Sequence, residues 1–293
     1  MEKQMLNVFY VVDKNFITHF TVSLTSLLEN NQHLDISVYV IHDLDDKSLF
    51  ENIISFVKSK YNVILNIIEI DNSIFNNLPI TDNISKASYF RLLLAEILPQ
   101  NVLSGLYIDC DTIVTGSLQE LLETSFFEKG NESKEYSILA VSDANGAKEI
   151  IRLNELGVDP QFYFNAGVLF VNLKKWRNDA VSKLIIIKAE QYKDHLKWHD
   201  QDVLNIFFVD ACGKLDDAYN GFASNQLPKM PVILHFNGSS KPWHYFNDGP
   251  YKPVYWKYLK MTPFKNEKFE EITINNRIRK IKNSVKKYLK IQS

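Results

Sequence analysis

The chain has 293 residues, of which 45% are hydrophobic and 23% charged, and its formal net charge is −2. This length is enough for one large α/β domain or two small ones, with a buried core. The near-neutral charge gives no reason to expect nucleic acid as a partner. No stretch approaches the roughly 18 apolar residues of a membrane-spanning helix. The two cysteines, Cys110 and Cys212, form no metal cluster or disulfide framework, so we expect a soluble cytoplasmic protein.

Short apolar strands alternate with helices in the first part of the chain. Strands are expected at residues 6–12, 36–41 and 63–70, and helices at 18–29 and 47–60. This alternation indicates βαβ units and a mainly parallel sheet flanked by helices. Ligands of such sheets bind beyond the carboxyl ends of the strands, and Asp13 and Asn15 follow the first strand at that edge.

The middle of the chain continues this α/β pattern. A helix containing Arg91 is expected at 85–98, and Ser117 with Glu120 forms the capping-box pattern that opens another helix. The remaining strands are expected at 103–108, 137–141, 168–172 and 232–236.

The strand expected at 103–108 leads directly into Asp109-Cys110-Asp111. Because strand side chains alternate with period two, both carboxylates are expected to face one crevice while Cys110 faces the core. Two converging carboxylates repel each other unless a cation lies between them, and Mg²⁺ or Mn²⁺ prefers such oxygen ligands. The pair alone is a weak signal, because it also occurs by chance. With Thr112 it also fits the aspartyl-nucleophile motif of haloacid-dehalogenase phosphatases.

Three later segments carry polar side chains. Asn165-Ala166-Gly167 is interpreted as a polar corner before a strand, where glycine lets a ligand approach the backbone. Trp198-His199-Asp200-Gln201-Asp202 is either a binding cluster or a helix N-terminus with acidic residues in its first turn. A histidine in a strand is usually structural, but His235 precedes Gly238 and Lys241, which suits a metal ligand followed by a phosphate-neutralising cation.

Together these segments resemble family 8 glycosyltransferases, the family of glycogenin and of bacterial lipooligosaccharide galactosyltransferases. The resemblance extends from residue 8 to about residue 244. It rests on six blocks in the same order: Asp13-Lys14-Asn15, Tyr89-Phe90-Arg91-Leu92, Leu106-Tyr107-Ile108-Asp109-Cys110-Asp111, Tyr163-Phe164-Asn165-Ala166-Gly167, Asp200-Gln201-Asp202, and His235-Phe236-Asn237-Gly238 with Lys241-Pro242-Trp243.

The resemblance implies a GT-A fold with a Rossmann-like sheet in a single catalytic domain, which we place at residues 1–263. It also implies a UDP-hexose donor, with glucose or galactose as the sugar, and Mn²⁺ or Mg²⁺ as the metal. The sugar would be transferred, with retention of configuration, to a glycan, lipid-linked or cell-envelope acceptor.

The resemblance also implies roles for single residues. The metal ligands would be Asp109, Asp111 and His235. The nucleotide-sugar contacts would be Asp13 and Asn15 at the uridine, Arg91, Asp143, Asn165, Ala166 and Asp200 at the sugar and the metal-side hydroxyls, and Gly238 and Lys241 at the diphosphate, with Cys110 between the two metal-binding aspartates. Gln201 would lie nearest the anomeric carbon.

Gln201 is an uncharged amide and a poor nucleophile, so front-face attack guided by the leaving phosphate is expected. Lys241 would assist as a second cation, and Asp200 is the alternative nucleophile. The sequence departs from the family at two places. Ser104-Gly105 replaces the usual lysine and is expected to loosen the start of the Asp-x-Asp strand, and a shorter stretch between Tyr219 and His235 is expected to open the acceptor groove.

Other functions are compatible with the central motif. The phosphatase alternative is disfavoured because some hundred residues precede the carboxylate pair and the late motif carries His235 and Lys241. A non-catalytic UDP-sugar-binding protein and a self-glucosylating enzyme remain alternatives.

The C-terminal segment, residues 264–293, differs in character from the rest. Residues 272–293 contain no acidic residue and seven basic ones, interleaved with apolar residues at helical spacing. This pattern predicts a basic amphipathic helix. Such a helix either docks on the catalytic domain or attaches peripherally to the inner face of an anionic membrane, where each Lys or Arg contributes ~1 kcal/mol.

Overall fold

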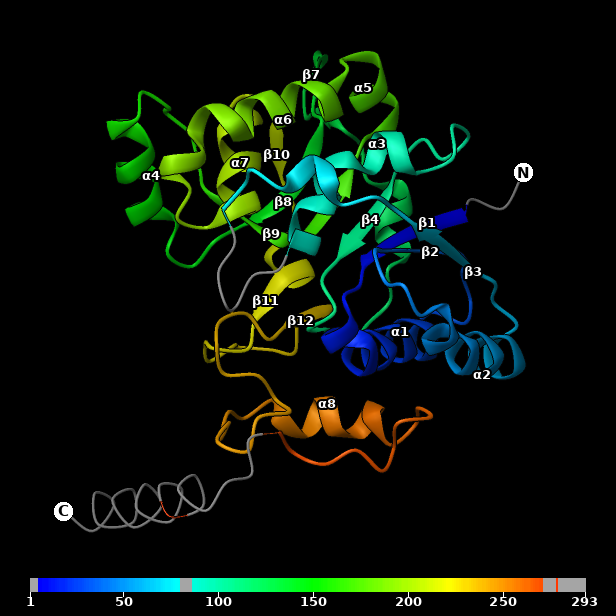
Figure 1. Cartoon of the computed structure of the whole chain (residues 1–293). Helices are drawn as coiled ribbons and strands as arrows, with labels where there is room; N and C mark the ends of the chain where they lie inside the picture. Colours follow the sequence, from blue (N-terminus) through cyan, green and yellow to red (C-terminus); the bar gives the residue numbers. More distant parts are fainter. Residues whose placement is uncertain (1–4, 80–85, 271–277, 279–293) are drawn as a thin grey trace, which may run out of the picture.

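The computed structural model describes residues 5–79, 86–270 and 278. Its centre is a seven-stranded sheet in the order β10-β8-β9-β4-β1-β2-β3 (Figure 1). The strands are β1 (Met5–Val11), β2 (Asp35–His42), β3 (Leu65–Glu69), β4 (Gly105–Ile108), β8 (Ile138–Ser142), β9 (Phe164–Val171) and β10 (Cys212–Lys214). All neighbours pair in parallel except β9, which runs antiparallel to β4 and β8. The predicted mainly parallel sheet is confirmed.

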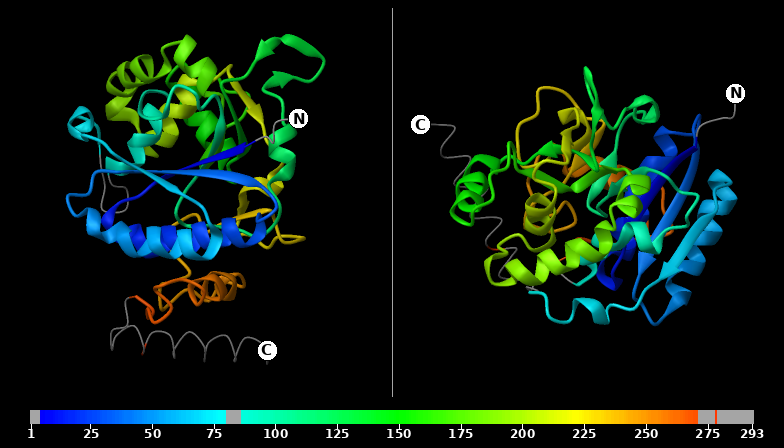
Figure 2. Two further views of the ribbon diagram at one scale, coloured as in Figure 1. Left: turned by 90° about the vertical axis from the view of Figure 1, so that its right-hand side faces the viewer. Right: turned by 90° about the horizontal axis from the view of Figure 1, so that it is seen from above.

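Helices cover both faces of this sheet (Figure 2). One layer holds α1 (Ile17–Asn30) and α2 (Glu51–Tyr61). The other holds the 3₁₀ helix η4 (Lys86–Leu93), α3 (Leu94–Ile97), α5 (Leu173–Asn178), α6 (Val181–Tyr192) and α7 (His199–Phe207). The apolar side chains between sheet and helices form the core, as the burial requirement of a two-faced parallel sheet demands.

The remaining elements lie outside the central sheet and its two helix layers. They are the 3₁₀ helix η5 (Gln119–Glu123), α4 (Gly146–Glu155), α8 (Lys252–Leu259), the sheet of β5 (Thr112–Val114), β11 (Gly221–Phe222) and β12 (Ile233–His235), and the hairpin of β6 (Phe127–Glu128) and β7 (Asn131–Glu135). Helix α8 packs against α1, where Asn30 Nδ2 donates to the Tyr258 hydroxyl at 2.8 Å. None of the helices in the described parts of the chain combines the length and apolar character needed to cross a membrane.

The helix predicted at 85–98 is wrong in type. Residues 86–93 form the 3₁₀ helix η4, and only the four residues of α3 are α-helical. Every residue from Tyr89 to Ala95 is buried, so no single apolar stripe favours the 3.6-residue period. In addition, the Arg91 side chain bonds to its own turn, with Nε donating to the Ser88 carbonyl at 3.0 Å.

The predicted capping box at Ser117 is also wrong, since η5 is a five-residue 3₁₀ turn. The Ser117 hydroxyl accepts from the Gln119 N–H at 3.2 Å and bonds His33 Nε2 at 3.0 Å. The hydroxyl therefore accepts from the second residue after it, in a shorter turn than the one that a capping box closes.

The expected loosening at Ser104-Gly105 is wrong as well. Gly105 is the first residue of β4, and a Cβ at this position would lie 2.4 Å from Phe9 Cζ and 2.6 Å from the Asn7 carbonyl oxygen. The Asn7 side chain donates to the Ser104 carbonyl at 3.0 Å. The glycine therefore lets the Phe9 ring pack over the strand, and the start of β4 is tightly held.

The first residues of the predicted C-terminal tail pack on the domain. The Phe269 ring lies 4.3 Å from the Trp256 ring, and the Glu270 N–H donates to the Trp243 carbonyl at 3.0 Å. The basic helix predicted at 272–293 lies outside the described residues, apart from Ile278.

Candidate active site

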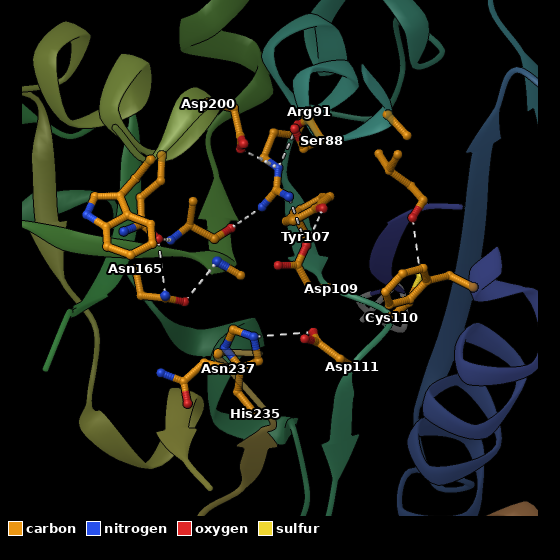
Figure 3. A pocket seen from close by; sticks show the side chains of 18 of the residues that line it. Ser88, Arg91, Tyr107, Asp109, Cys110, Asp111, Asn165, Asp200, His235 and Asn237 are labelled. Carbon is orange, nitrogen blue, oxygen red and sulfur yellow. Dashed lines mark hydrogen bonds and ion pairs between the residues drawn. The ribbon is translucent and has the colours of Figure 1, made fainter. Parts of the chain in front are cut away.

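A cavity of about 390 Å³ opens where the carboxyl ends of β1 and β4 meet β9, α7 and the segment after β12 (Figure 3). The predicted site residues that line it are Asp13, Arg91, Asp109, Cys110, Asp111, Asp143, Asn165, Ala166, Asp200, Gln201, His235, Gly238 and Lys241. Asn15 does not line it. Its backbone N–H is bound by the Asp13 side chain at 2.8 Å, and its exposed side chain faces a smaller hollow beside His19 and Trp243.

The Asp-x-Asp motif lies in a turn and not in a strand, because β4 ends at Ile108. The turn is closed by Thr112, whose N–H and hydroxyl both donate to the Asp109 carbonyl, at 3.2 and 2.7 Å. The strand-alternation argument is therefore wrong, but its outcome holds. Asp109 and Asp111 both reach the cavity, whereas the Cys110 thiol is buried and donates to the Val11 carbonyl at 3.2 Å.

His235 is brought to these carboxylates by the small sheet, in which β12 runs antiparallel to β5 with His235 opposite Thr112. Asp109, Asp111 and His235 each offer one ligand atom, and these atoms lie within 4.8 Å of one another. The Asn220 side chain fixes the imidazole: its Oδ1 lies 2.9 Å from His235 Nδ1, and its Nδ2 donates to Asn165 Oδ1 at 3.0 Å. Since Nδ1 donates to this oxygen, Nε2 is the nitrogen left for a metal.

Gly167 leaves the space in which this group assembles. A Cβ at Gly167 would lie 2.3 Å from His235 Cε1 and 2.9 Å from Asp109 Oδ2. The residue belongs to β9, which starts at Phe164, so the predicted corner at 165–167 is wrong. Antiparallel pairing extends β9 back to Phe164, opposite Ser142. The glycine therefore serves the approach of two side chains to the strand.

The two carboxylate oxygens of Asp111 face different groups, Lys241 at Oδ2 and His235 Nε2 at Oδ1. Lys241 Nζ donates to Asp111 Oδ2 at 2.5 Å and to the Phe236 carbonyl at 2.8 Å. Burial alone would raise the pKa of Asp111, but the charges of Lys241 and His235 outweigh it and hold that pKa well below its ordinary value. The buried Oδ1 lies 3.3 Å from His235 Nε2, but it forms no well-aligned hydrogen bond with any of the described residues. Two carboxylates and an imidazole with one such oxygen fit a divalent metal ion.

Arg91 holds the other side of the cavity. Its Nη2 lies 3.1 Å from Asp109 Oδ1, and its Nε lies 2.9 Å from Asp200 Oδ2. Nη1 donates to the Ala166 carbonyl at 2.7 Å, and the guanidinium lies over the Tyr107 ring, 4.5 Å from its centroid. Burial raises the pKa of Asp200 to about 6, although Arg91 acts to lower it. Near pH 7 both carboxylates are thus held beside one buried cation.

Gln201 is held in one orientation. Its Oε1 accepts from Asn165 Nδ2 at 3.1 Å and from the Ala166 N–H at 3.0 Å. Its Nε2 donates to the Tyr163 hydroxyl at 3.2 Å and lies 3.5 Å from Asp143 Oδ2. The oxygen therefore already has two donors, and the amide is a fixed polar surface of the cavity.

Asp202 supports the start of α7 and does not line the cavity. Its Oδ2 accepts from the backbone N–H groups of Lys197 and Trp198, at 2.7 and 2.9 Å. Its Oδ1 accepts from the Tyr163 hydroxyl at 2.7 Å and is paired with Arg152 Nη2. The predicted helix N-terminus with acidic residues in its first turn is confirmed, and binding by Asp200 and Gln201, which reach the cavity, stays a prediction.

Several lining residues were not singled out as site residues from the sequence: Val11, Phe16, Ala87, Ser88, Tyr107, Asn145, Gly167, Trp198 and Asn237. Four of them lie inside or beside the blocks that carried the family resemblance: Tyr107, Gly167, Trp198 and Asn237. Their closeness to a motif could have marked them as site residues. Asn220, which orients His235, has no such signal. It is brought to the site by the turn between β10 and β11.

These features define a glycosyltransferase with the GT-A fold, and comparisons with known proteins agree. The family model for glycosyl transferase family 8 matches residues 7–247. A lipopolysaccharide 1,2-glucosyltransferase of Escherichia coli is 28% identical, over 83% of this chain and 74% of that protein. A lipopolysaccharide 1,3-galactosyltransferase of Salmonella typhimurium is 30% identical, over 81% of this chain and 73% of that protein.

Solved structures show the same fold. The galactosyltransferase LgtC, in complex with donor and acceptor sugar analogues, superposes with a TM-score of 0.78 at 22% identity, over 88% of this chain and 96% of that chain. The chain belongs to glycosyl transferase family 8. It is a retaining hexosyltransferase.

Proposed function

We propose that this enzyme transfers glucose or galactose from a UDP-sugar to a cell-envelope glycan or lipid-linked acceptor, with a divalent metal held by Asp109, Asp111 and His235. The convergence of these three side chains within 4.8 Å carries the proposal. The buried Asp111 Oδ1 adds to it, because this oxygen faces His235 Nε2 at 3.3 Å without a well-aligned hydrogen bond among the described residues. Bound Mn²⁺ or Mg²⁺ would supply positive charge against the diphosphate of the donor.

Lys241 supplies a second positive charge on the same side. It is bound to Asp111 and stands three residues after Gly238, whose φ of 85° turns the chain above the cavity. In this conformation the backbone around Gly238 can approach a phosphate closely. Asp13, which ends the segment after β1, is our candidate contact for the uridine.

The sugar would lie between Arg91, Asp143 and Asn165, which line one wall of the cavity. Both donors on Gln201 Oε1 come from the protein, so this amide is unsuited to attack the anomeric carbon. Asp200 is paired with Arg91, which reduces its nucleophilicity. We therefore favour front-face attack: the acceptor hydroxyl bonds to C1 on the face that the phosphate leaves, and its proton passes to the departing phosphate oxygen.

The acceptor is assigned by chemistry and by relatives. Trp198 is 42% exposed at the rim of the cavity and offers an aromatic face to a sugar ring. The two lipopolysaccharide transferases named above support a cell-envelope acceptor. Peripheral membrane attachment through residues 272–293, at the cytoplasmic face, stays a prediction, and co-sedimentation of the full chain and a truncated chain with anionic liposomes tests it.

The central test measures UDP release from UDP-glucose and UDP-galactose with Mn²⁺ or Mg²⁺. We expect slow hydrolysis of one donor, and loss of both hydrolysis and metal-dependent UDP binding in Asp109→Asn and Asp111→Asn. Asp179→Asn is the matched control, because Asp179 is exposed and paired only with Lys175 at 2.8 Å in the described structure. Full activity of either site variant overturns the proposal. UDP binding without turnover would indicate a binding protein, and release of inorganic phosphate would indicate a phosphatase.

A further inference from the structure

Lys241 belongs to a segment that is held mainly from its far end. Residues 238–240 are exposed, whereas Pro242 and Trp243 are buried. Lys241 and His244 close one turn: the His244 N–H donates to the Lys241 carbonyl at 3.0 Å, and the Lys241 N–H donates to His244 Nδ1 at 3.2 Å. The position of Lys241 therefore depends on what fixes Trp243, in addition to the bonds from Lys241 Nζ to Asp111 and to the Phe236 carbonyl.

Trp243 is fixed by His19 of α1. The two rings stack with centroids 3.4 Å apart and an interplanar angle of 11°, and Trp243 is 4% exposed. The Trp243 carbonyl accepts from the Glu270 N–H at 3.0 Å, and the Pro242 carbonyl accepts from Trp256 Nε1 at 3.0 Å. Helix α8 and residues 264–270 thus cover the side of the segment that α1 does not.

The His19 ring is itself held at both nitrogens. Nδ1 lies 2.7 Å from the Tyr255 hydroxyl, and Nε2 lies 3.3 Å from Glu270 Oε1. The ring is 4% exposed, so these contacts fix its plane inside the protein. An aromatic ring alone would supply the stack, and an amide alone would supply part of the hydrogen bonding, so the two contributions can be separated by mutation.

The same helix also holds the Asp-x-Asp turn. Ser23 is one helical turn after His19 and shares its face of α1. The Ser23 hydroxyl lies 3.1 Å from the Thr112 hydroxyl, which donates to the Asp109 carbonyl. Helix α1 thus contacts both the segment that carries Lys241 and the turn that carries Asp111.

We propose that His19 is a positioning residue for the donor diphosphate, which acts by fixing Trp243 and, through it, the distance between Lys241 and the Asp109–Asp111 turn. This inference rests on the proposed function, in which Lys241 contacts the diphosphate. If His19 had a purely structural role, its mutation would lower the stability of the protein and leave the affinity for the donor unchanged. This difference separates the two roles.

The test is a double-mutant cycle on UDP affinity, measured by calorimetry with Mn²⁺ present. We expect His19→Ala to weaken UDP binding about tenfold, within the range of coupling energies between interacting residues. In the Lys241→Met background the same change should alter affinity less than about twofold, because the group that His19 positions is gone. His19→Phe, which keeps the stack, should retain most of the affinity, and His19→Gln should not.

Trp176→Phe is the matched control. Trp176 is also a fully buried ring, stacked on Phe208 at 5.2 Å and hydrogen-bonded to the Ser137 carbonyl, on the α5 side of the sheet. The Trp176→Phe change should lower the melting temperature and leave UDP affinity unchanged. If Lys241→Met binds UDP normally, the proposed role of Lys241 fails. If Lys241→Met weakens binding but His19→Phe and His19→Ala both bind as the native protein does, only the present inference fails. If His19→Ala does not fold, the UDP affinities of His19→Phe and His19→Gln decide whether His19 positions Lys241.

Discussion

The two sides of the cavity are built differently. The helix wall comprises Arg91, Asp200 and Gln201, from η4 and α7. Its Arg91 guanidinium forms ion pairs with both Asp109 and Asp200, and the Gln201 Oε1 accepts two hydrogen bonds from the protein. The turn wall comprises Asp111, His235 and Lys241. There the only neighbour of the buried Asp111 Oδ1 in the described parts of the chain is His235 Nε2, at 3.3 Å and without a well-aligned hydrogen bond, and Gly167 leaves open the space around the imidazole.

This difference indicates that the helix wall is preorganised and that the turn wall is completed by a bound ligand. On the helix wall a buried guanidinium balances two carboxylates, so that wall keeps its geometry alone. On the turn wall the low pKa of Asp111 keeps the carboxylate charged in a buried place, ready for a cation. Changes in the helix wall should therefore cost stability as well as activity, and changes in the turn wall should mainly cost metal and donor binding.

Arg91→Met should show the largest effect. It leaves the buried Asp200 and the partly exposed Asp109 without their cation, and removing one partner of a buried ion pair typically costs about 3–5 kcal/mol in the free energy of unfolding. Sugar transfer should fall as well, by at least about 100-fold, because the orientation of both carboxylates is lost. Urea unfolding and donor turnover measure the two effects.

Arg177→Met is the control for this change. Arg177 donates to the carbonyls at the end of α3, including Ala95 at 3.0 Å and Val102 at 2.7 Å, and does not line the cavity. It should lose stability and keep its affinity for UDP. If Arg91→Met unfolds at the same urea concentration as the native protein, the helix wall is not held by this ion-pair network.

Gly167→Ala tests the turn wall by adding one methyl group. The new Cβ would lie 2.3 Å from His235 Cε1, so the imidazole must move. We expect about 1–3 kcal/mol of destabilisation, typical of overpacking, together with weaker Mn²⁺ binding. Gly130→Ala gives the comparison, because a Cβ there would meet nothing within 4 Å and Gly130 lies in the β6–β7 hairpin; its positive φ of 82° adds backbone strain alone. Unchanged Mn²⁺ affinity in Gly167→Ala would refute the close approach of His235.

Asn220→Ala should weaken metal binding while largely sparing the fold. It removes the acceptor that orients His235 Nδ1, and loss of such an outer partner typically costs about 10- to 100-fold in metal affinity. Asn220→Asp restores an acceptor at this position and should recover part of the affinity. Titration of Mn²⁺ with UDP present measures both variants, and equal affinity in Asn220→Ala and the native protein would contradict the assignment.

The sequence predicted the residues of both walls, but it did not predict the ion pairs within the helix wall. Asp109, Asp111, His235 and Lys241 belong to short motifs whose order along the chain could be recognised without coordinates. The partnership of Arg91 with Asp200 spans more than a hundred residues, and no local pattern encodes it. Asn220 was missed for the same reason, since its contacts come from tertiary packing.

The fold shows the same division. Strands with clear β-branched runs, such as β1 and β2, were predicted within one or two residues of their observed ends. The segment at 86–97 was predicted as one helix, although burial on all sides removes the periodicity that distinguishes α from 3₁₀ geometry. The role of Gly105 was misjudged because the packing of the Phe9 ring over it depends on the pairing of β1 with β4.

The smallest expected effect on stability concerns Glu149, a residue behind the helix wall. Glu149 is paired with Lys197 at 2.8 Å and with Arg152 at 2.7 Å. Burial acts to raise the pKa of Glu149, but its hydrogen bonds to Lys197, Trp198 and Arg152 prevail and lower that pKa from 4.5 to about 2. A folded-state pKa below the unfolded one stabilises the protein above about pH 4.5, and this contribution is lost as the pH falls toward 2.

In Glu149→Gln that contribution is absent at every pH. The native protein should therefore exceed the variant in unfolding free energy by on the order of 1 kcal/mol at pH 6, a value kept low because Lys197 is half exposed and screened by solvent. The difference should shrink between pH 4.5 and pH 3, and urea unfolding of both proteins across this range measures it. Asp111 titrates equally in the native protein and in Glu149→Gln, so its effect cancels in the difference between their unfolding free energies. Glu190→Gln, whose partner Lys193 lies 4.0 Å away at the surface, should show no such trend. A pH-independent difference would show that the charge of Glu149 does not support the helix wall.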